Sequence, residues 1–428
     1  MNKVIKKVFI GIVCVLIFVK QYNFGVEKMD IFDSIDAPEV LVAETNSLDI
    51  IFERNIDKKI YPASLTKLLT AILVVENTSL EDIVTVSENA VLSVPVGYVN
   101  ACLQVGEELT VKDLLNVLLI SSANDAANAL AEHVGGSIDS FSAMMNTKAK
   151  ELGCTSSNFT NPSGLHQLTH YTTVRDLMLI SRAAIQNNIV KNILGTIMYK
   201  LPISNKYNEE NRIFYTTNYM IRQSYSNFYC DYIIGGKTGY TDQAQNCVVE
   251  FVEKDGISLI VIVIGESSAI KGKKFLDCKE LCEYIFKNYK NYNVINKEDI
   301  FDTIEIKKAT NSTKKLQVKT DKDINILMIK DDDIKDVKVN INYFEKKSPI
   351  KEGETIGKVI YEYNEKQYEA NLIAVNNVEE TENLKKFFRI ILIFALLYII
   401  QNLKKSKRNI GKHGKNKKHK KYKKARRR

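Results

Sequence analysis

The sequence predicts an α+β domain, in which helices flank an antiparallel sheet, followed by a small all-β domain and one membrane-spanning helix. β-branched runs lie near both ends of the first domain, and helical periodicity fills the interval between them. From about residue 300 onward, short alternating runs are separated by turns rich in Asn, Asp, Lys and Gly, which is typical of an all-β domain. Near the carboxyl end, residues 387–403 are apolar except for Arg389, Gln401 and Asn402.

The composition indicates a globular protein with a charged end. With 428 residues, of which 45% are hydrophobic, the chain can form two domains and appended segments. The net charge of +9 is local, because residues 404–428 hold 15 Lys and Arg and no Asp or Glu. The rest of the chain is therefore net acidic. Enzymes that act on nucleic acid normally carry basic residues over the folded surface, so we expect no nucleic-acid partner.

The amino-terminal segment is typical of a secretory signal, which we assign to residues 1–28. Lys3, Lys6 and Lys7 precede an apolar stretch over residues 8–19, the order found in such signals. Because no small-x-small cleavage site follows, an uncleaved anchor is the alternative.

A transmembrane helix is predicted over residues 386–403. The 17 apolar-rich residues 387–403 rise about 25 Å as a helix, slightly less than the ~30 Å hydrocarbon core, and Arg389 can reach outward from one edge. A basic segment stays on the cytoplasmic side. We therefore expect residues 404–428 to be cytoplasmic and the domains to lie outside the cell membrane. The alternatives are a buried core helix and, for the tail, a nucleic-acid arm instead of a contact with anionic lipid.

The first domain is predicted over residues 36–292. It starts with a hairpin at residues 38–55, where two apolar runs flank Thr45-Asn46-Ser47. Helices are then expected at residues 64–76, 111–121, 125–133, 140–152 and 174–189, the first of them apolar on too many faces for a surface helix. A second hairpin joins residues 247–252 to 257–264 through Asp255-Gly256, and a helix at 275–289 closes the domain. The sheet is thus made from both ends of the domain.

The second domain is predicted over residues 300–376. Its expected strands lie at residues 303–306, 316–318, 324–328, 337–341, 359–363 and 368–373. A polar link leads from it to the transmembrane helix.

The cysteines do not predict a metal site. Seven are present, without a Cys-x-x-Cys pair, so neither zinc nor a disulfide framework is indicated. Cys278 and Cys282 are one helical turn apart and are expected to pack in a core. We expect no cofactor and no metal.

Three short motifs, met in order along the chain, point to an active-site serine. They are Ser64-x-x-Lys67, Ser122-x-Asn124 and Lys237-Thr238-Gly239. Each motif is weak alone, and Ser-x-x-Lys also occurs at Ser312, in a polar stretch without a helix. The order and the structural setting of the first set carry the prediction.

Acyl transfer by a serine needs a base and an oxyanion site. On a helix Ser64 and Lys67 share a face, and Pro62 just upstream suits a helix start. The N–H of Ser64 can then serve as an oxyanion donor. Lys67 must be neutral to act as the base, and burial together with a second cation, Lys237, would lower its pKa from about 10.4. Taken alone, the pair also fits a surface lysine beside a capping serine.

The other two motifs supply proton transfer and substrate binding. Ser122 can pass the proton from Lys67 to the leaving amine, and Asn124 can hold the substrate amide, although ordinary helix capping would also explain both residues. In the third motif, Lys237 and Thr238 can bind a substrate carboxylate. Gly239 leaves room for a ligand backbone, and Tyr240 would offer the second oxyanion N–H.

With these motifs the chain resembles the low-molecular-mass penicillin-binding proteins, which are serine-type D-alanyl-D-alanine carboxypeptidases. The similar blocks lie at residues 61–67, 122–126, 159–165, 170–173 and 236–241, and more faintly at 348–353 and 356–357 in the second domain. Gln245 stands where the family usually has glycine. Many relatives also use an amphipathic surface helix, where this chain has an apolar one.

The resemblance implies a β-lactamase/transpeptidase-like catalytic domain and an acyl-enzyme on Ser64. Lys67 would be the proton acceptor, Ser122 the proton shuttle and Lys237 the group that binds the terminal carboxylate. The implied partner is a peptidoglycan stem peptide ending in D-Ala-D-Ala, and β-lactams would be covalent inhibitors.

Three rival functions share the motifs. A class A β-lactamase needs a further glutamate, and no segment here resembles the loop that carries it. A peptidoglycan DD-endopeptidase fits equally well. A penicillin-binding sensor without turnover is disfavoured, because Ser64, Lys67, Ser122 and Lys237 are all present.

Overall fold

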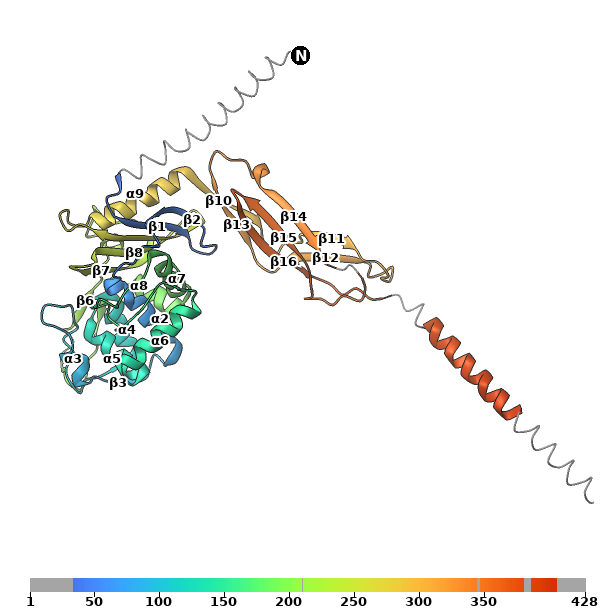
Figure 1. The fold of residues 1–428 in the computed structure, drawn as a ribbon, viewed down its shortest axis with the longest axis horizontal. Helices are drawn as coiled ribbons and strands as arrows, with labels where there is room; N and C mark the ends of the chain where they lie inside the picture. Colours follow the sequence, from blue (N-terminus) through green and yellow to red (C-terminus); the bar gives the residue numbers. More distant parts are fainter. Residues whose placement is uncertain (1–33, 210, 345–346, 381–385, 406–428) are drawn as a thin grey trace, which may run out of the picture. The chain divides into compact units, whose positions relative to one another are not determined.

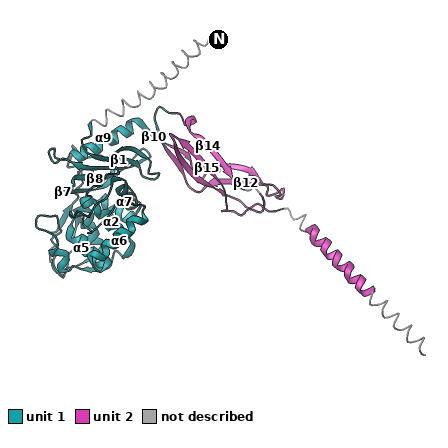
Figure 2. Cartoon of the chain, viewed as in Figure 1, with its two compact units in different colours: residues 1–291, 327–332 teal, residues 292–326, 333–428 magenta. Residues whose placement is uncertain are grey.

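The computed structural model describes residues 34–209, 211–344, 347–380 and 386–405, which fall into two compact units (Figure 2). Unit 1 runs to Asn291 and includes Leu327–Asp332, and unit 2 comprises Tyr292–Ile326 and the chain from Asp333 onward. The predicted signal at residues 1–28 lies outside the described residues, as does the tail beyond residue 405.

Unit 1 is built on a five-stranded antiparallel sheet of order β2-β1-β9-β8-β7. The amino-terminal hairpin supplies β1 (Glu39–Glu44) and β2 (Ile50–Arg54), and β1 pairs with β9 (Ile257–Glu266). The sheet therefore combines both ends of the domain, as the sequence predicts. β8 (Gln245–Lys254) and β9 form the second expected hairpin, with φ of 51° at Asp255 and 76° at Gly256. Two left-handed residues are what a tight hairpin turn requires.

The fifth strand, β7 (Ile233–Thr241), carries the third motif and is missing from the sequence prediction. Residues 233–239 include three glycines, which have low strand propensity. The strand forms because it pairs with β8 along its whole length, from Ile233 opposite Val252 to Thr241 opposite Gln245. Lys237 and Thr238 thus lie within an edge strand. In this part of the chain the sequence predicts strands only from residue 247 onward.

Each face of the sheet packs against helices, and the strand residues alternate between the two cores. Leu41, Val249, Phe251, Ile260 and Ile262 pack with the larger helical group. Their neighbours on the other face, which include Val40, Val248, Val261 and Val263, pack against α9 (Lys273–Asn288). Figure 1 shows α9 on one side of the sheet and the remaining helices on the other. Cys278 and Cys282 of α9 are fully buried free thiols, which confirms their predicted packing role.

The helical group surrounds α2 (Lys67–Asn77), in which every residue from Lys67 to Val74 is buried. Around it lie α4 (Val111–Ile120), α5 (Asn124–Gly135), α6 (Ile138–Glu151), α7 (Val174–Gln186) and α8 (Asn188–Leu194), and α3 (Glu88–Leu92) packs against α5. Thr110 begins α4 with a capping box to Asp113, a favourable helix start. Small strand pairs join β3 (Ile83–Thr85) to β4 (Glu108–Thr110) and β5 (Met198–Lys200) to β6 (Ile213–Tyr215).

Two helices differ from the prediction. The helix expected at residues 64–76 starts as a 3₁₀ turn over Ala63–Thr66, and the α-helix begins at Lys67. The helix expected at 174–189 ends at Gln186, because Asn187 takes an extended conformation and its Oδ1 accepts hydrogen bonds from the N–H groups of Ile189 and Val190. Asparagine favours such helix starts, so a new helix, α8, begins there.

Unit 2 contains an antiparallel sheet of order β11-β12-β16-β15-β14. Its strands are β11 (Asp302–Glu305), β12 (Lys315–Thr320), β14 (Lys338–Tyr343), β15 (Thr355–Tyr363) and β16 (Lys366–Ala374). The chain also forms β10 (Tyr289–Ile295) and β13 (Ile324–Ile329). Leu316, Val318, Val359 and Leu372 are fully buried, so the alternating runs of the sequence are strands with one apolar face.

One helix among the described residues, Lys386–Lys405, is long and apolar enough to cross a membrane. Its 20 residues rise about 30 Å, and none of its apolar window is buried. A core helix would be mostly buried, so the exposure of these side chains argues against the alternative of a buried core helix.

Candidate active site

Ser64 and Lys67 lie on the first turns of the buried helix at the centre of unit 1. Ser64 belongs to the 3₁₀ turn and is half-buried, whereas Lys67 opens α2 and is fully buried. The Nζ atom of Lys67 is 2.9 Å from the Oγ atom of Ser64. The tighter 3₁₀ geometry brings residues three apart onto the same side of the helix.

Lys67 has three oxygen neighbours, and two of them can only accept hydrogen bonds. Its Nζ lies 2.7 Å from Oδ1 of Asn124 and 2.6 Å from the carbonyl oxygen of Ser163. A neutral amine would have two N–H groups for these acceptors and a lone pair left for the Ser64 hydroxyl, the arrangement that a base needs to accept its proton.

Burial lowers the pKa of Lys67 well below its ordinary value of 10.5, and the charge of Lys237 lowers it further. Asp125 opposes both effects, more weakly. The carboxylate of Asp125 is itself engaged by the N–H groups of Ala101 and Leu103, at 2.8 and 3.0 Å. The two causes predicted from the sequence, burial and a second cation, are the two that the structure contains.

A tight turn at residues 161–164 places the Ser163 carbonyl oxygen beside Lys67. No role for this turn was predicted from the sequence. Asn161 Oδ1 accepts hydrogen bonds from the N–H groups of Ser163 and Gly164, at 3.2 and 2.8 Å. Gly164 has φ of +83°, and a Cβ there would lie 1.8 Å from the carbonyl oxygen of Ala63. Only glycine fits so close to the Ser64 turn. The motif Asn161-Pro162-Ser163-Gly164 was the available signal.

His170 stabilises the same region through hydrogen bonds to Thr66 and Thr160. Its Nδ1 accepts a hydrogen bond from the N–H of Thr160 at 3.1 Å, which leaves Nε2 as the donor to Thr66 Oγ1 at 2.9 Å. Burial lowers the pKa of His170 to about 4, with smaller contributions from His166 and Lys67. The imidazole is therefore neutral at physiological pH, and it holds the Ser64–Lys67 turn without adding positive charge.

The second and third motifs meet through Ser122 and Lys237. Ser122 follows α4 in a left-handed conformation with φ of +68°, a strained state for a residue with a side chain. Its Oγ lies 2.9 Å from Nζ of Lys237, which also donates a hydrogen bond of 2.8 Å to the Thr238 carbonyl oxygen. Burial, with a contribution from Lys274, lowers the pKa of Lys237 to about 7.

The remaining residues of the third motif line the same strand. Thr238 Oγ1 is 2.6 Å from Oγ1 of Thr217, a partner that the sequence did not indicate. A Cβ at Gly239 would lie 3.2 Å from the backbone N of Ser64, so glycine leaves that N–H accessible. Tyr240 is exposed beyond it. Gln245 has φ of +56° opposite Thr241, a conformation that favours glycine, yet the β7–β8 pairing reaches this position.

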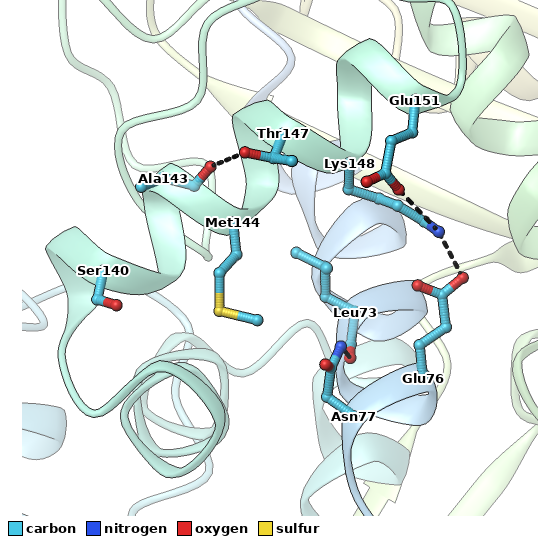
Figure 3. A pocket seen from close by; sticks show the side chains of 9 residues that line it. All are labelled: Leu73, Glu76, Asn77, Ser140, Ala143, Met144, Thr147, Lys148 and Glu151. Carbon is cyan, nitrogen blue, oxygen red and sulfur yellow. Dashed lines mark hydrogen bonds and ion pairs between the residues drawn. The ribbon is translucent and has the colours of Figure 1, made fainter.

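A surface pocket between α2 and α6 does not belong to this site (Figure 3). It is lined by Leu73 and Met144 and crossed by an ion pair of 2.7 Å between Lys148 Nζ and Glu76 Oε1. It contains none of the motif residues. Among the described residues, no group of three His, Cys, Asp or Glu side chains could hold a metal ion.

Comparisons with known proteins agree with the fold. Residues 26–268 match the family model described as D-alanyl-D-alanine carboxypeptidase, and residues 289–380 match the C-terminal domain of penicillin-binding protein 5. The D-alanyl-D-alanine carboxypeptidase DacF of Bacillus subtilis is 28% identical over 358 residues, covering 82% of this chain and 86% of that protein. The carboxypeptidase DacA of Haemophilus influenzae is 28% identical over 381 residues, covering 85% and 92%.

Among solved structures, penicillin-binding protein 5 from Haemophilus influenzae superposes with a TM-score of 0.68. The match has 25% sequence identity and covers 81% of this chain and 98% of that one. Unit 1 is thus a transpeptidase-like α+β catalytic domain, followed by an all-β domain of the penicillin-binding protein 5 type. The chain belongs to the family of serine-type D-alanyl-D-alanine carboxypeptidases.

Proposed function

We propose that the protein is a membrane-anchored, extracytoplasmic DD-carboxypeptidase that removes the terminal D-alanine of peptidoglycan stem peptides through an acyl-enzyme on Ser64. The observation that carries this proposal is the environment of Lys67. Its amine is fully buried, lies 2.9 Å from the Ser64 hydroxyl, and has two further oxygen acceptors at 2.7 and 2.6 Å. This is the arrangement of an activated serine nucleophile.

Acylation uses the three motifs together. Lys67 accepts the Ser64 proton as Oγ attacks the carbonyl carbon of the penultimate D-alanine, while Lys237 and Thr238 hold the terminal carboxylate. The N–H groups of Ser64 and Tyr240 stabilise the tetrahedral oxyanion. Collapse breaks the C–N bond, and the proton taken by Lys67 passes through Ser122 to the leaving D-alanine amine.

Deacylation returns the enzyme to its starting state. Water attacks the ester carbonyl, Lys67 accepts a water proton, and the C–O bond to Ser64 breaks. Ser64 Oγ recovers that proton, and the new carboxyl group of the shortened peptide releases the second water proton to solvent, so that the peptide leaves as a carboxylate. The proposed steps use only Ser64, Lys67, Ser122, the substrate and water, and need no cofactor.

The membrane anchor is supported by the helix Lys386–Lys405. Its apolar side chains are exposed, and its length of about 30 Å matches the thickness of a hydrocarbon core. Lys404 and Lys405 begin a run of basic residues that continues in the sequence to residue 428. Basic segments beside a membrane-spanning helix remain in the cytoplasm, which would leave both domains outside.

The proposal is tested by measuring D-alanine release from diacyl-L-Lys-D-Ala-D-Ala, together with the mass of the Ser64 peptide after treatment with penicillin. Release of one D-alanine per peptide and a penicilloyl adduct on Ser64 are expected. Cleavage of a cross-linked muropeptide dimer without D-alanine release would favour the endopeptidase alternative. An adduct without either reaction would favour the sensor.

The affinity for substrate should fall as the pH rises above about 7. Lys237, with a pKa of about 7 in the free enzyme, is protonated below that pH and can pair with the carboxylate; above it, the amine is neutral. KM should therefore increase by up to about tenfold per pH unit above 7. Steady-state kinetics over pH 5 to 9 measure this increase.

A Lys237→Arg variant provides the comparison for this pH dependence. Arginine remains charged throughout the range, so whatever activity the variant retains should have a KM that no longer rises above pH 7. A KM that rises equally in the wild type and in this variant would exclude Lys237 as the titrating group.

A further inference from the structure

We propose that Glu250 is a positioning residue for the subsite that binds the terminal carboxylate of the substrate. This inference rests on the proposed function. Glu250 lies on β8, directly opposite Gly236 on β7, and Gly236 precedes Lys237. The side chain is on the face of the sheet that packs against α9, so it lies behind the strand that carries Lys237 and Thr238.

The carboxyl group of Glu250 passes under β7 through the space left by a glycine. A Cβ at Gly236 would lie 2.2 Å from Oε2 of Glu250 and 2.8 Å from Nδ2 of Asn218. A side chain at position 236 would therefore separate these two groups. In the structure, Nδ2 of Asn218 donates a hydrogen bond of 2.7 Å to Oε2 of Glu250. Glu250 thus links β8 to a segment on the far side of the edge strand.

That segment contacts the third motif and the end of the helix that precedes the second motif. Thr217 precedes Asn218; its hydroxyl lies 2.6 Å from the Thr238 hydroxyl, and its N–H donates to the carbonyl oxygen of Ile120 at 3.2 Å. Ile120 ends α4, two residues before Ser122. The segment therefore connects the Ser122 turn to the Lys237 strand, and the hydrogen bond from Asn218 to Glu250 holds the segment in place.

The surroundings of Glu250 favour the neutral form of its carboxyl group. The side chain is fully buried, and its Oε1 has no hydrogen-bond partner among the described residues. Burial raises the pKa of Glu250 well above 4.5, and the opposing effects of Asn218 and Lys274 are smaller. A neutral carboxyl leaves the charge of Lys237 available for the substrate. A glutamine, which has the same shape, should support the same hydrogen bond.

The test compares acylation of the full-length enzyme by diacyl-L-Lys-D-Ala-D-Ala with acylation by the same peptide carrying a C-terminal amide. The wild type should prefer the carboxylate. In Glu250→Val the segment loses its hydrogen bond from Asn218, and the preference for the carboxylate should fall about tenfold. A displacement of Lys237 and Thr238 by a fraction of an ångström costs less than the ~10²-fold expected for a full ångström. Glu250→Gln should restore the wild-type preference.

Val252→Ala is the matched control for loss of packing. Val252 is buried on the same face of β8, two residues along, and contributes to the same core. Its variant should lose stability and retain the carboxylate preference. An unchanged preference in folded Glu250→Val, or an equal fall in Val252→Ala, would overturn the inference. Failure of the wild type to process either peptide would instead overturn the proposed function.

Discussion

Replacement of Ser64 by alanine is expected to abolish acylation by penicillin and to reduce D-alanine release by at least ~10⁴-fold. The hydroxyl oxygen is the atom that would form the ester, and it lies 2.9 Å from the Lys67 amine. Because Ser64 is half-buried and loses one hydrogen bond, the unfolding free energy should change by only about 1 kcal/mol. Labelling with a fluorescent penicillin and thermal unfolding measure the two effects.

Ser312 supplies the control for this substitution. It begins another Ser-x-x-Lys sequence, but it lies in an exposed turn of unit 2, with its hydroxyl 3.2 Å from that of Thr310. Ser312→Ala should therefore label and turn over like the wild type. Penicillin labelling that survives in Ser64→Ala and disappears in Ser312→Ala would show that Ser312, and not Ser64, is the nucleophile.

Replacement of Lys67 by arginine is expected to lower the acylation rate by about 10³-fold, within the range of a lost general base. Arginine stays protonated in proteins and so cannot accept the Ser64 proton. Its larger head group must also fit a fully buried space whose oxygen neighbours lie within 2.9 Å. The measurement is the first-order acylation rate constant at saturating penicillin from pH 6 to 10, which does not include the loss of binding expected when Lys237 becomes neutral.

The pH dependence separates a lost base from a disturbed fold. The wild-type rate should rise with pH as Lys67 loses its proton, at a pH well below 10.5 because burial and Lys237 lower the pKa. The arginine variant should show no such rise. Lys191→Arg, at a partly exposed lysine paired with Glu253, should behave like the wild type. A Lys67→Arg rate within tenfold of the wild type would exclude Lys67 as the base.

Most helices and strands follow from local patterns. The strand hairpin at Asp255-Gly256, the capped start of α4 and the alternating strands of unit 2 all depend on residues within a few positions of one another. β7 was missed because its pairing with β8, not its own composition, makes it a strand. The break at Asn187 was missed for a related reason: the apolar periodicity continues across it, while one side-chain amide starts a second helix.

The sequence by itself determined the motifs, their order and the chemistry that their side chains can perform. Ser-x-x-Lys puts a hydroxyl and an amine within contact range by helical geometry alone, and burial of Lys67 follows from the apolar residues around it. The tertiary structure decided which groups complete the site. Three contacts join residues far apart in the sequence: Ser163 and Lys67 are separated by 96 positions, Lys237 and Ser122 by 115, and Glu250 and Asn218 by 32. Such contacts depend on how the sheet and helices close on one another, and a backbone carbonyl or a glycine-sized gap has no signature in the identity of a single residue.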